Sequence, residues 1–145
     1  MFKHILLPVD GSSTSLMAVD KVRGLAQAFK STVTVIYVID PYAFSGVGAD
    51  FSYGQAQYLG AATAEANEVL AAATQRLEAA GVTVSESIIE SHAIYRGILE
   101  TASSVGADLI VMGSHGRRGL EKLVLGSVAA QVLAHANLPI LVVRD

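Results

Sequence analysis

The sequence predicts an α/β protein with a doubly wound, open parallel sheet of five strands flanked by four helices. Short apolar or β-branched segments alternate along the chain with longer segments whose apolar residues recur at helical spacing. The length of 145 residues suits a single domain over residues 1–145, and a hydrophobic content of 52% supplies a sizeable core. The predicted order is therefore β-α-β-α-β-α-β-α-β.

The five strands are predicted at residues 3–9, 32–39, 82–90, 108–112 and 140–143. The second ends in a fully apolar run, which is typical of a strand buried on both faces. In the third, Val82, Val84 and Ile88 alternate with polar residues, which favours an edge position or one wet face. Residues 40–57 mix turn-forming residues with aromatics and are predicted to be a loop.

The four helices are predicted where apolar residues recur every three or four positions, at residues 12–29, 59–80, 94–105 and 127–136. Ser12 or Ser13 can cap the first helix, and Gly81 closes the second. Asn137 and Pro139 end the fourth before the last strand. In such folds ligands bind beyond the carboxyl ends of the strands, so the segments to inspect are residues 8–13, 38–41, 91–92 and 113–118.

Composition excludes several classes of function. The net charge of −3 gives little support for a basic nucleic-acid-binding face. The absence of cysteine rules out disulfides, thiolate metal sites and cysteine nucleophiles. No apolar run approaches the roughly 20 residues of a membrane span, and the start of the chain lacks a signal-peptide cleavage site. These observations favour a cytoplasmic protein with no direct membrane insertion and no nucleic-acid partner.

A glycine-rich segment follows the fourth predicted strand. Gly113, Gly116 and Gly119 fall within seven residues, and Gly126-Ser127 then opens a helix. Glycine lets the backbone approach a ligand closely, and successive N–H groups in such a turn form a concave anion site. The free N–H groups and the dipole of a helix N-terminus also favour an anion. The segment therefore suits a polyphosphate.

Arg117, Arg118 and Lys122 can add charge-assisted hydrogen bonds to such an anion. A tight turn with solvated arginines is the alternative. The segment matches neither the Walker A loop nor the G-x-G-x-x-G pattern of dinucleotide-binding folds. The histidines show no metal-ligand spacing, and no catalytic Ser-His-Asp set or general base is recognisable, so we predict neither a metal site nor catalytic residues.

The spacing of Gly113, Gly116, Gly126 and Ser127, G-x2-G-x9-G-S, resembles the ATP-binding signature of the universal stress protein family. The Pro-Val-Asp-Gly-Ser that ends the first strand, Val-Ile-Asp at residues 38–40, Asp-Leu-Ile-Val-Met-Gly at 108–113 and the closing Leu-Pro-Ile-Leu-Val-Val are also similar to the family. The resemblance covers essentially the whole chain. It implies a Rossmann-like fold of the universal stress protein type.

The resemblance implies ATP, with Mg²⁺, as the ligand. By position it assigns binding to Pro8, Val9, Asp10, Val38, Met112, Gly113, Ser114, His115, Gly116, Arg117, Arg118, Gly126, Ser127 and Val128. Asp10 would meet the ribose hydroxyls, Val38 would touch the adenine with Met112 nearby, and residues 113–128 would surround the phosphates. For Asp10 the alternative is an N-cap of the first helix, and for Val38 and Met112 it is core packing.

The function implied is that of an ATP-binding regulatory protein of the stress response, whose nucleotide occupancy modulates oligomeric state or contact with a partner. A slow ATPase and a nucleotide-free dimeric interaction module are the alternatives. The sequence does not name the client, and a membrane transporter is one candidate. The apolar last strand, residues 139–143, is predicted at a sheet edge, where the family commonly dimerises, so a homodimer or higher homo-oligomer is expected.

Overall fold

A computed structural model describes residues 1–41, 48–116 and 125–145, with the backbone alone at residues 48–52. Strands and helices alternate through the described residues. The elements are β1 (His4–Pro8), α1 (Ser13–Phe29), β2 (Thr32–Ile39), α2 (Gly48–Ala79), β3 (Val84–Glu90), α3 (Ile94–Val105), β4 (Leu109–Gly113), α4 (Ser127–His135) and β5 (Ile140–Val143). Apart from the start of α2, each predicted boundary lies within two residues of the observed one.

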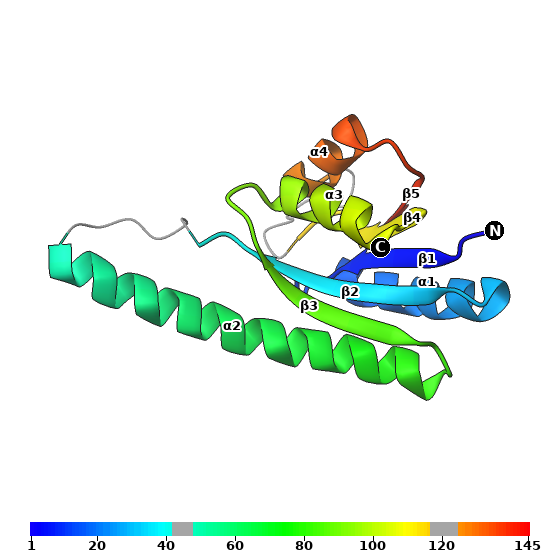
Figure 1. Cartoon of the computed structure of the whole chain (residues 1–145), viewed down its shortest axis with the longest axis horizontal. Coiled ribbons are helices and arrows are strands. Elements are labelled where there is room, and N and C mark those ends of the chain that lie inside the picture. The colour runs from blue at the N-terminus through cyan, green and yellow to red at the C-terminus, as the bar shows by residue number, and fades with distance from the viewer. Residues whose placement is uncertain (42–47, 117–124) are drawn as a thin grey trace.

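The sheet has the order β3-β2-β1-β4-β5, and all its neighbouring strands are parallel. The chain moves outward from β1 to β3, then returns to the other side of β1 to add β4 and β5 (Figure 1). The order therefore reverses between β1 and β4. The two connections that start there leave in opposite directions and open a crevice at the carboxyl ends of these strands. The predicted fold class is confirmed.

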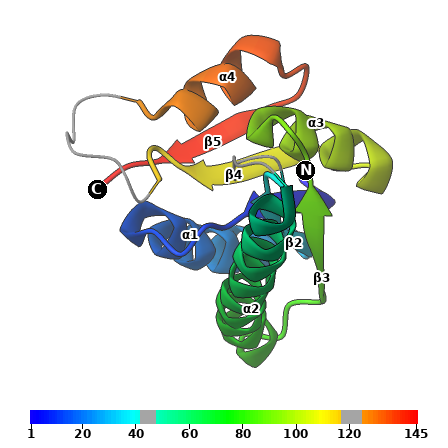
Figure 2. The same ribbon diagram turned by 90° about the vertical axis from the view of Figure 1, so that its left-hand side faces the viewer.

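Helices cover both faces of the sheet, with α1 and α2 on one face and α3 and α4 on the other (Figure 2). Consecutive residues of β1 alternate between the two cores. Ile5 and Leu7 pack toward α1 and α2, whereas Leu6 packs toward α3 and α4. Because both faces are buried, the strand is apolar from Ile5 onward rather than alternating.

The two edges of the sheet differ in character. β3 lies at one edge, where Val84 and Ile88 pack against the core beneath α2 while Ser85 and Ser87 are exposed. The predicted edge position with a wet face is confirmed. β5 lies at the other edge, as predicted, and its four residues, Ile140–Val143, carry no charge.

The prediction of a loop over residues 40–57 is wrong for residues 48–57, because α2 is already helical from Gly48. Figure 1 shows this helix extending well beyond the sheet. Once a long helix is nucleated, each further residue adds a hydrogen bond, which offsets the cost of about 1 kcal/mol for a glycine in its interior. Gln55 and Tyr58 also donate to the carbonyls of Pro41 and Asp40, both at 3.1 Å, and hold this end of α2 to the end of β2.

Residues 42–47 of the predicted loop lie outside the described residues. In the part of the chain that is described, no helix is long and apolar enough to cross a bilayer.

Candidate functional site

A cavity of about 460 Å³ lies at the carboxyl ends of the strands, where the sheet order reverses. It is lined by the carboxyl ends of β1, β2 and β4, by the segments that follow β1 and β4, and by the first turns of α1, α3 and α4. The lining residues are Pro8, Val9, Asp10, Ser12, Ser15, Tyr37, Val38, Ile94, Ile98, Met112, Gly113, His115, Gly116, Gly126, Ser127, Val128 and Ala129. The position is the one that topology dictates for a ligand site in an open parallel sheet.

The turn between β1 and α1 is held by hydrogen bonds within the turn itself. Gly11 takes a φ of +81°, which L side chains rarely adopt. The carboxylate of Asp10 accepts from the N–H of Ser12 at 2.9 Å, and its own N–H donates to the Ser15 hydroxyl at 3.2 Å. Ser12 is the N-cap of α1, because its hydroxyl accepts from the N–H of Ser15 at 3.2 Å. The alternative role of Asp10 as that N-cap is therefore wrong.

The loop after β4 is held from three sides. The N–H of Ser114 donates to the carbonyl of Val143 at 2.8 Å, which extends the pairing of β4 with β5. The carbonyl of Ser114 in turn accepts from the N–H of Gly126 at 2.7 Å, which draws the start of α4 against the loop. On the third side, the hydroxyl of Thr14 in α1 donates to the carbonyl of His115 at 2.6 Å. The cavity wall is thus assembled from segments about a hundred residues apart in sequence.

The N-terminus of α4 opens onto the cavity. Its N-cap, Gly126, has no side chain to accept from the first turn, and Ser127, Val128 and Ala129 all line the cavity. The first N–H groups of a helix lack partners within the helix, and the helix dipole places partial positive charge there. An anion at this end of the cavity would meet both.

The glycines of the G-x2-G-x9-G-S pattern occupy positions where packing within the protein leaves little room for a side chain. A Cβ atom at Gly113 would lie 2.9 Å from the backbone nitrogen of Ser15 and would overlap the Thr14 hydroxyl. At Gly126 it would lie 3.0 Å from the Cα atom of His115. At Gly116 it would lie 3.0 Å from an oxygen of Asp10. The glycines therefore bring the β1–α1 turn, the loop after β4 and the start of α4 close enough to enclose one cavity.

Part of the cavity lining is apolar. Val38 at the end of β2 and Met112 in β4 face Ile94 and Ile98 from the first turns of α3. Helix α3 can approach β2 closely because residue 97 is glycine, where a Cβ atom would lie 3.1 Å from a methyl carbon of Val38. Met112 is buried and also packs in the core, so its two candidate roles are compatible. The result is an apolar slot bounded by aliphatic side chains.

Most of the residues predicted to bind the ligand line this one cavity. Ser114 does not: its side chain is buried away from the lining, and its hydroxyl has no hydrogen-bond partner among the described residues. Arg117 and Arg118 lie outside the described residues. The roles of individual residues toward ATP stay predictions.

The sequence reasoning missed six lining residues: Ser12, Ser15, Tyr37, Ile94, Ile98 and Ala129. Ser12 lies within the marked segment 8–13. Tyr37 and Ala129 adjoin the predicted site residues Val38 and Val128, and Ile94 lies two residues beyond the marked segment 91–92. Ser15 and Ile98 become visible as lining only when α1 and α3 are placed over the strand ends.

The other end of the sheet carries a separate polar network. Both ring nitrogens of His4 are hydrogen-bonded, to Thr32 at 2.6 Å and to Thr34 at 2.7 Å. Burial lowers the pKa of His4 below its ordinary value, although the nearby carboxylate of Asp108 opposes the shift. For Asp108, burial acts to raise the pKa, but backbone N–H donors from Lys3 and His4 outweigh it, so the pKa is lowered. None of these groups lines the cavity.

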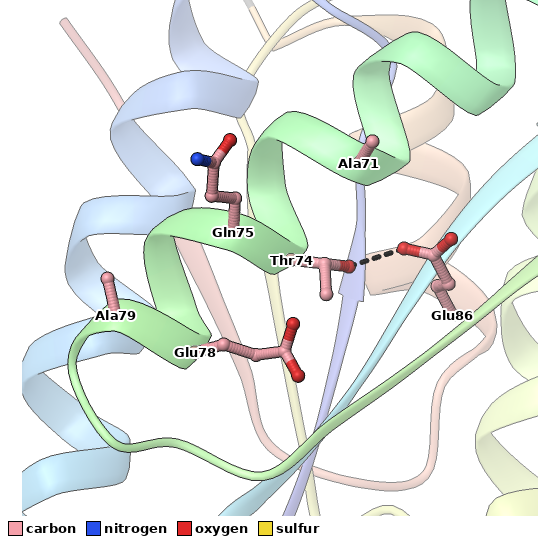
Figure 3. A pocket seen from close by; sticks show the side chains of 6 residues that line it. All are labelled: Ala71, Thr74, Gln75, Glu78, Ala79 and Glu86. Atoms are coloured by element: carbon pink, nitrogen blue, oxygen red, sulfur yellow. Dashed lines mark hydrogen bonds between the residues drawn. The ribbon is translucent and has the colours of Figure 1, made fainter.

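A second, shallower hollow lies between the C-terminal half of α2 and β3 (Figure 3). It is lined by Ala71, Thr74, Gln75, Glu78, Ala79 and Glu86. Thr74 donates a hydrogen bond to the carboxylate of Glu86 across it. The hollow contains neither a glycine loop nor a helix N-terminus, so it is not the site that the sequence indicates.

Comparison with known proteins agrees with this architecture. The model of the universal stress protein family matches residues 1–144. Universal stress protein MJ0531 of Methanocaldococcus jannaschii is 37% identical over 144 residues, covering 99% of this chain and 83% of that protein. The solved structure of MJ0577 from the same organism has a TM-score of 0.84 at 31% identity, covering 100% of this chain and 97% of that one.

A universal stress protein solved in complex with cAMP has a TM-score of 0.69 at 26% identity, covering 99% of this chain and 97% of the other. Over nearly its whole length, the chain therefore shares both sequence and fold with one group of proteins. The family match and the 37% identical relative show that this chain belongs to the universal stress protein family.

Proposed function

We propose that this protein binds ATP as a regulatory ligand of the stress response, and that nucleotide occupancy modulates its oligomeric state or its contact with a protein partner. The observation that carries the proposal is a single cavity that is lined both by an apolar slot and by the uncapped N-terminus of α4. Its volume of about 460 Å³ falls within the range of small-molecule sites, about 300–1,000 Å³. The related protein that binds cAMP supports an adenine nucleotide.

The proposed pose follows the chemistry of the cavity. The adenine lies between Val38 and Met112, and the ribose hydroxyls donate to the carboxylate of Asp10. One oxygen of that carboxylate already accepts from the N–H of Ser12. The phosphates lie against the first turn of α4, beginning at Ser127, with Arg117 and Arg118 as the proposed cationic partners. Mg²⁺ usually binds through nucleotide phosphates and one or two carboxylates, and Asp10 supplies a carboxylate to the described part of the cavity lining.

The proposed assembly uses the β5 edge. Leu141 is 40% exposed there, and an uncharged edge strand offers unpaired N–H and C=O groups to another chain. Two copies paired through β5 would be related by a two-fold axis. The hydrogen bond from the N–H of Ser114 to the carbonyl of Val143 connects the loop after β4 directly to this strand. A monomer whose edge is protected by Arg144 and Asp145 is the alternative.

The decisive test is the nucleotide that the purified protein retains. We expect mass spectrometry after denaturation to detect adenine nucleotide, and calorimetry to show tighter binding of ATP than of GTP. No retained nucleotide and no calorimetric heat with ATP would contradict the proposal and favour the nucleotide-free module. Release of phosphate on standing, measured on the same sample, would identify the slow ATPase.

Assembly needs a separate measurement. Light scattering at micromolar concentration, with and without ATP, should give a mass near twice the 15.1 kDa of the chain or a higher multiple. A monomer mass under both conditions would reject pairing through β5 and leave ATP binding unaffected.

A further inference from the structure

One hydrogen bond joins the two halves of the cavity wall. Thr14 is the second residue of α1 and is buried, and its hydroxyl donates to the carbonyl of His115 at 2.6 Å. The Ser12 hydroxyl reaches the same carbonyl only at 3.5 Å. Thr14 does not line the cavity, whereas His115 and Gly116 do. The carbonyl of His115 is therefore drawn out of the cavity wall, toward α1.

The orientation of this carbonyl also determines the direction of the next N–H. In a planar trans peptide, the C=O of one residue and the N–H of the next point in opposite directions. The N–H of Gly116 therefore points away from Thr14 and α1. No described residue accepts a hydrogen bond from it. The start of α4 lies beside the same segment, since a Cβ atom at Gly126 would lie 3.0 Å from the Cα atom of His115.

Residue 116 would tolerate the reverse orientation as well. A flip of the His115–Gly116 peptide changes the sign of φ at residue 116, which is not positive in the structure. Glycine populates both signs of φ about equally, so its own conformational preference does not select one orientation. In the flipped state the carbonyl oxygen of His115, which carries partial negative charge, would face the anion end of the cavity. A contact from outside the loop must exclude that state.

We propose that Thr14 is a positioning residue for phosphate: its hydroxyl locks the His115–Gly116 peptide so that the N–H of Gly116, rather than the carbonyl of His115, faces the ligand anion. The inference rests on the proposed ATP site and adds a residue outside the cavity to it. It requires Thr14 to act on the phosphates alone, because its hydroxyl bonds the loop after β4, whereas the proposed adenine contacts are Val38 and Met112.

The test compares two substitutions of Thr14 by calorimetry with ATP and with adenosine. Thr14→Val keeps the shape of the side chain beside Gly113 but removes the hydroxyl, and Thr14→Ser keeps the hydroxyl. We expect Thr14→Val to weaken ATP binding about tenfold or more, as for loss of a hydrogen bond to a charged group, with adenosine binding changed less than about twofold. Thr14→Ser should retain ATP affinity within about threefold.

Equal ATP affinity in Thr14→Val and the unmodified protein would overturn the proposed positioning role of Thr14, called the lock below. So would an equal loss of ATP and adenosine binding, or a loss in Thr14→Ser as large as in Thr14→Val. Failure of the unmodified protein to bind ATP would reject the ATP site itself, and the lock with it. The two failures are therefore distinguishable.

A second measurement holds even if Thr14→Val does not fold. Nuclear magnetic resonance of the unmodified protein, titrated with inorganic pyrophosphate, should shift the amide proton of Gly116 strongly downfield, as expected when an N–H donates to an anion. An unchanged Gly116 amide, while the amides of Ser127 and Val128 respond, would overturn the lock and leave the α4 site in place.

Discussion

Helices α1 and α4 both begin at the carboxyl edge of the sheet, yet their N-termini are capped differently. At α1 the Ser12 hydroxyl accepts from the N–H of Ser15, so the protein itself occupies the first turn. At α4 the cap is Gly126, which offers no side chain, and the first turn faces the cavity. Two helices whose dipoles place positive charge at the same edge of the sheet thus have different roles. α1 anchors the wall, and α4 is left open to an anion.

The comparison also explains the glycines. A serine or aspartate at position 126 would cap α4 as Ser12 caps α1, and it would press on His115. Gly126 therefore leaves the first N–H groups of α4 without a side-chain cap and lets the loop after β4 pack against the helix. Gly113 serves the anchoring side instead, because it makes room for Thr14 and Ser15 at the start of α1.

The largest effect is expected from giving α4 a cap. In Gly126→Asp the new carboxylate would accept from the first turn and repel the phosphates, which should weaken ATP binding by about a hundredfold or more in calorimetry. The matched control is Gly60→Ala in α2, where a Cβ atom meets nothing within 4 Å and ATP affinity should not change. If Gly126→Asp binds ATP within about threefold of the unmodified protein, α4 is not the phosphate site.

The next effect is on stability and tests the anchoring side. Gly113→Ala would force a methyl group onto Thr14 and Ser15, and we expect it to lower the free energy of unfolding by about 1–3 kcal/mol in urea titrations. Gly24→Ala, within α1 and with no atom within 4 Å of its Cβ position, should instead raise that free energy by up to about 1 kcal/mol. Equal stability of Gly113→Ala and the unmodified protein would show that the two segments are not tightly interlocked.

A smaller loss should follow from uncapping α1. Ser12→Ala removes the acceptor for the N–H of Ser15, which should lower the free energy of unfolding by about 1 kcal/mol, read from the urea midpoint by circular dichroism. The control is Ser104→Ala, which removes an exposed hydroxyl from α3 and should leave the midpoint nearly unchanged. An unchanged midpoint in Ser12→Ala would mean that solvent satisfies the first turn of α1 as well as the serine does.

The smallest expected effect is the pH dependence of stability due to His4, which lies at the end of the sheet away from the cavity. Because burial lowers the pKa of His4, the folded state binds its proton less readily than the unfolded chain does. The contribution of His4 to stability is present above the ordinary histidine pKa of about 6.5 and is lost as the pH falls below it through the lowered pKa of the folded state. Urea midpoints at about pH 7.5 and pH 5.5 should show this loss, and His4→Gln should reduce it. A rise in stability on acidification that His4→Gln abolishes would reverse the assigned sign.

Local patterns in the sequence determined much of the result. Burial on both faces makes the central strands continuously apolar, and the segments between them show helical spacing. The edge strand β3 is exposed at residues 85 and 87, so its sequence is mixed there. The resemblance of Gly113, Gly116, Gly126 and Ser127 to a nucleotide signature directed attention to residues that do line one cavity. The helical start of α2 was missed because its turn-forming residues are helical only as a continuation of the long helix that follows.

What only the tertiary structure decided is which contacts those residues make. Nothing local to Thr14 indicates that its hydroxyl reaches a carbonyl 101 residues away, or that the space left by Gly113 is filled by Thr14. Likewise, Ser12 and Gly126 are both acceptable N-caps in sequence, and only the placement of α1 and α4 at one edge makes their difference a property of the site. Spacing along the chain fixes the periodicity of each element, whereas contacts between distant segments depend on how the elements pack, which no local pattern encodes.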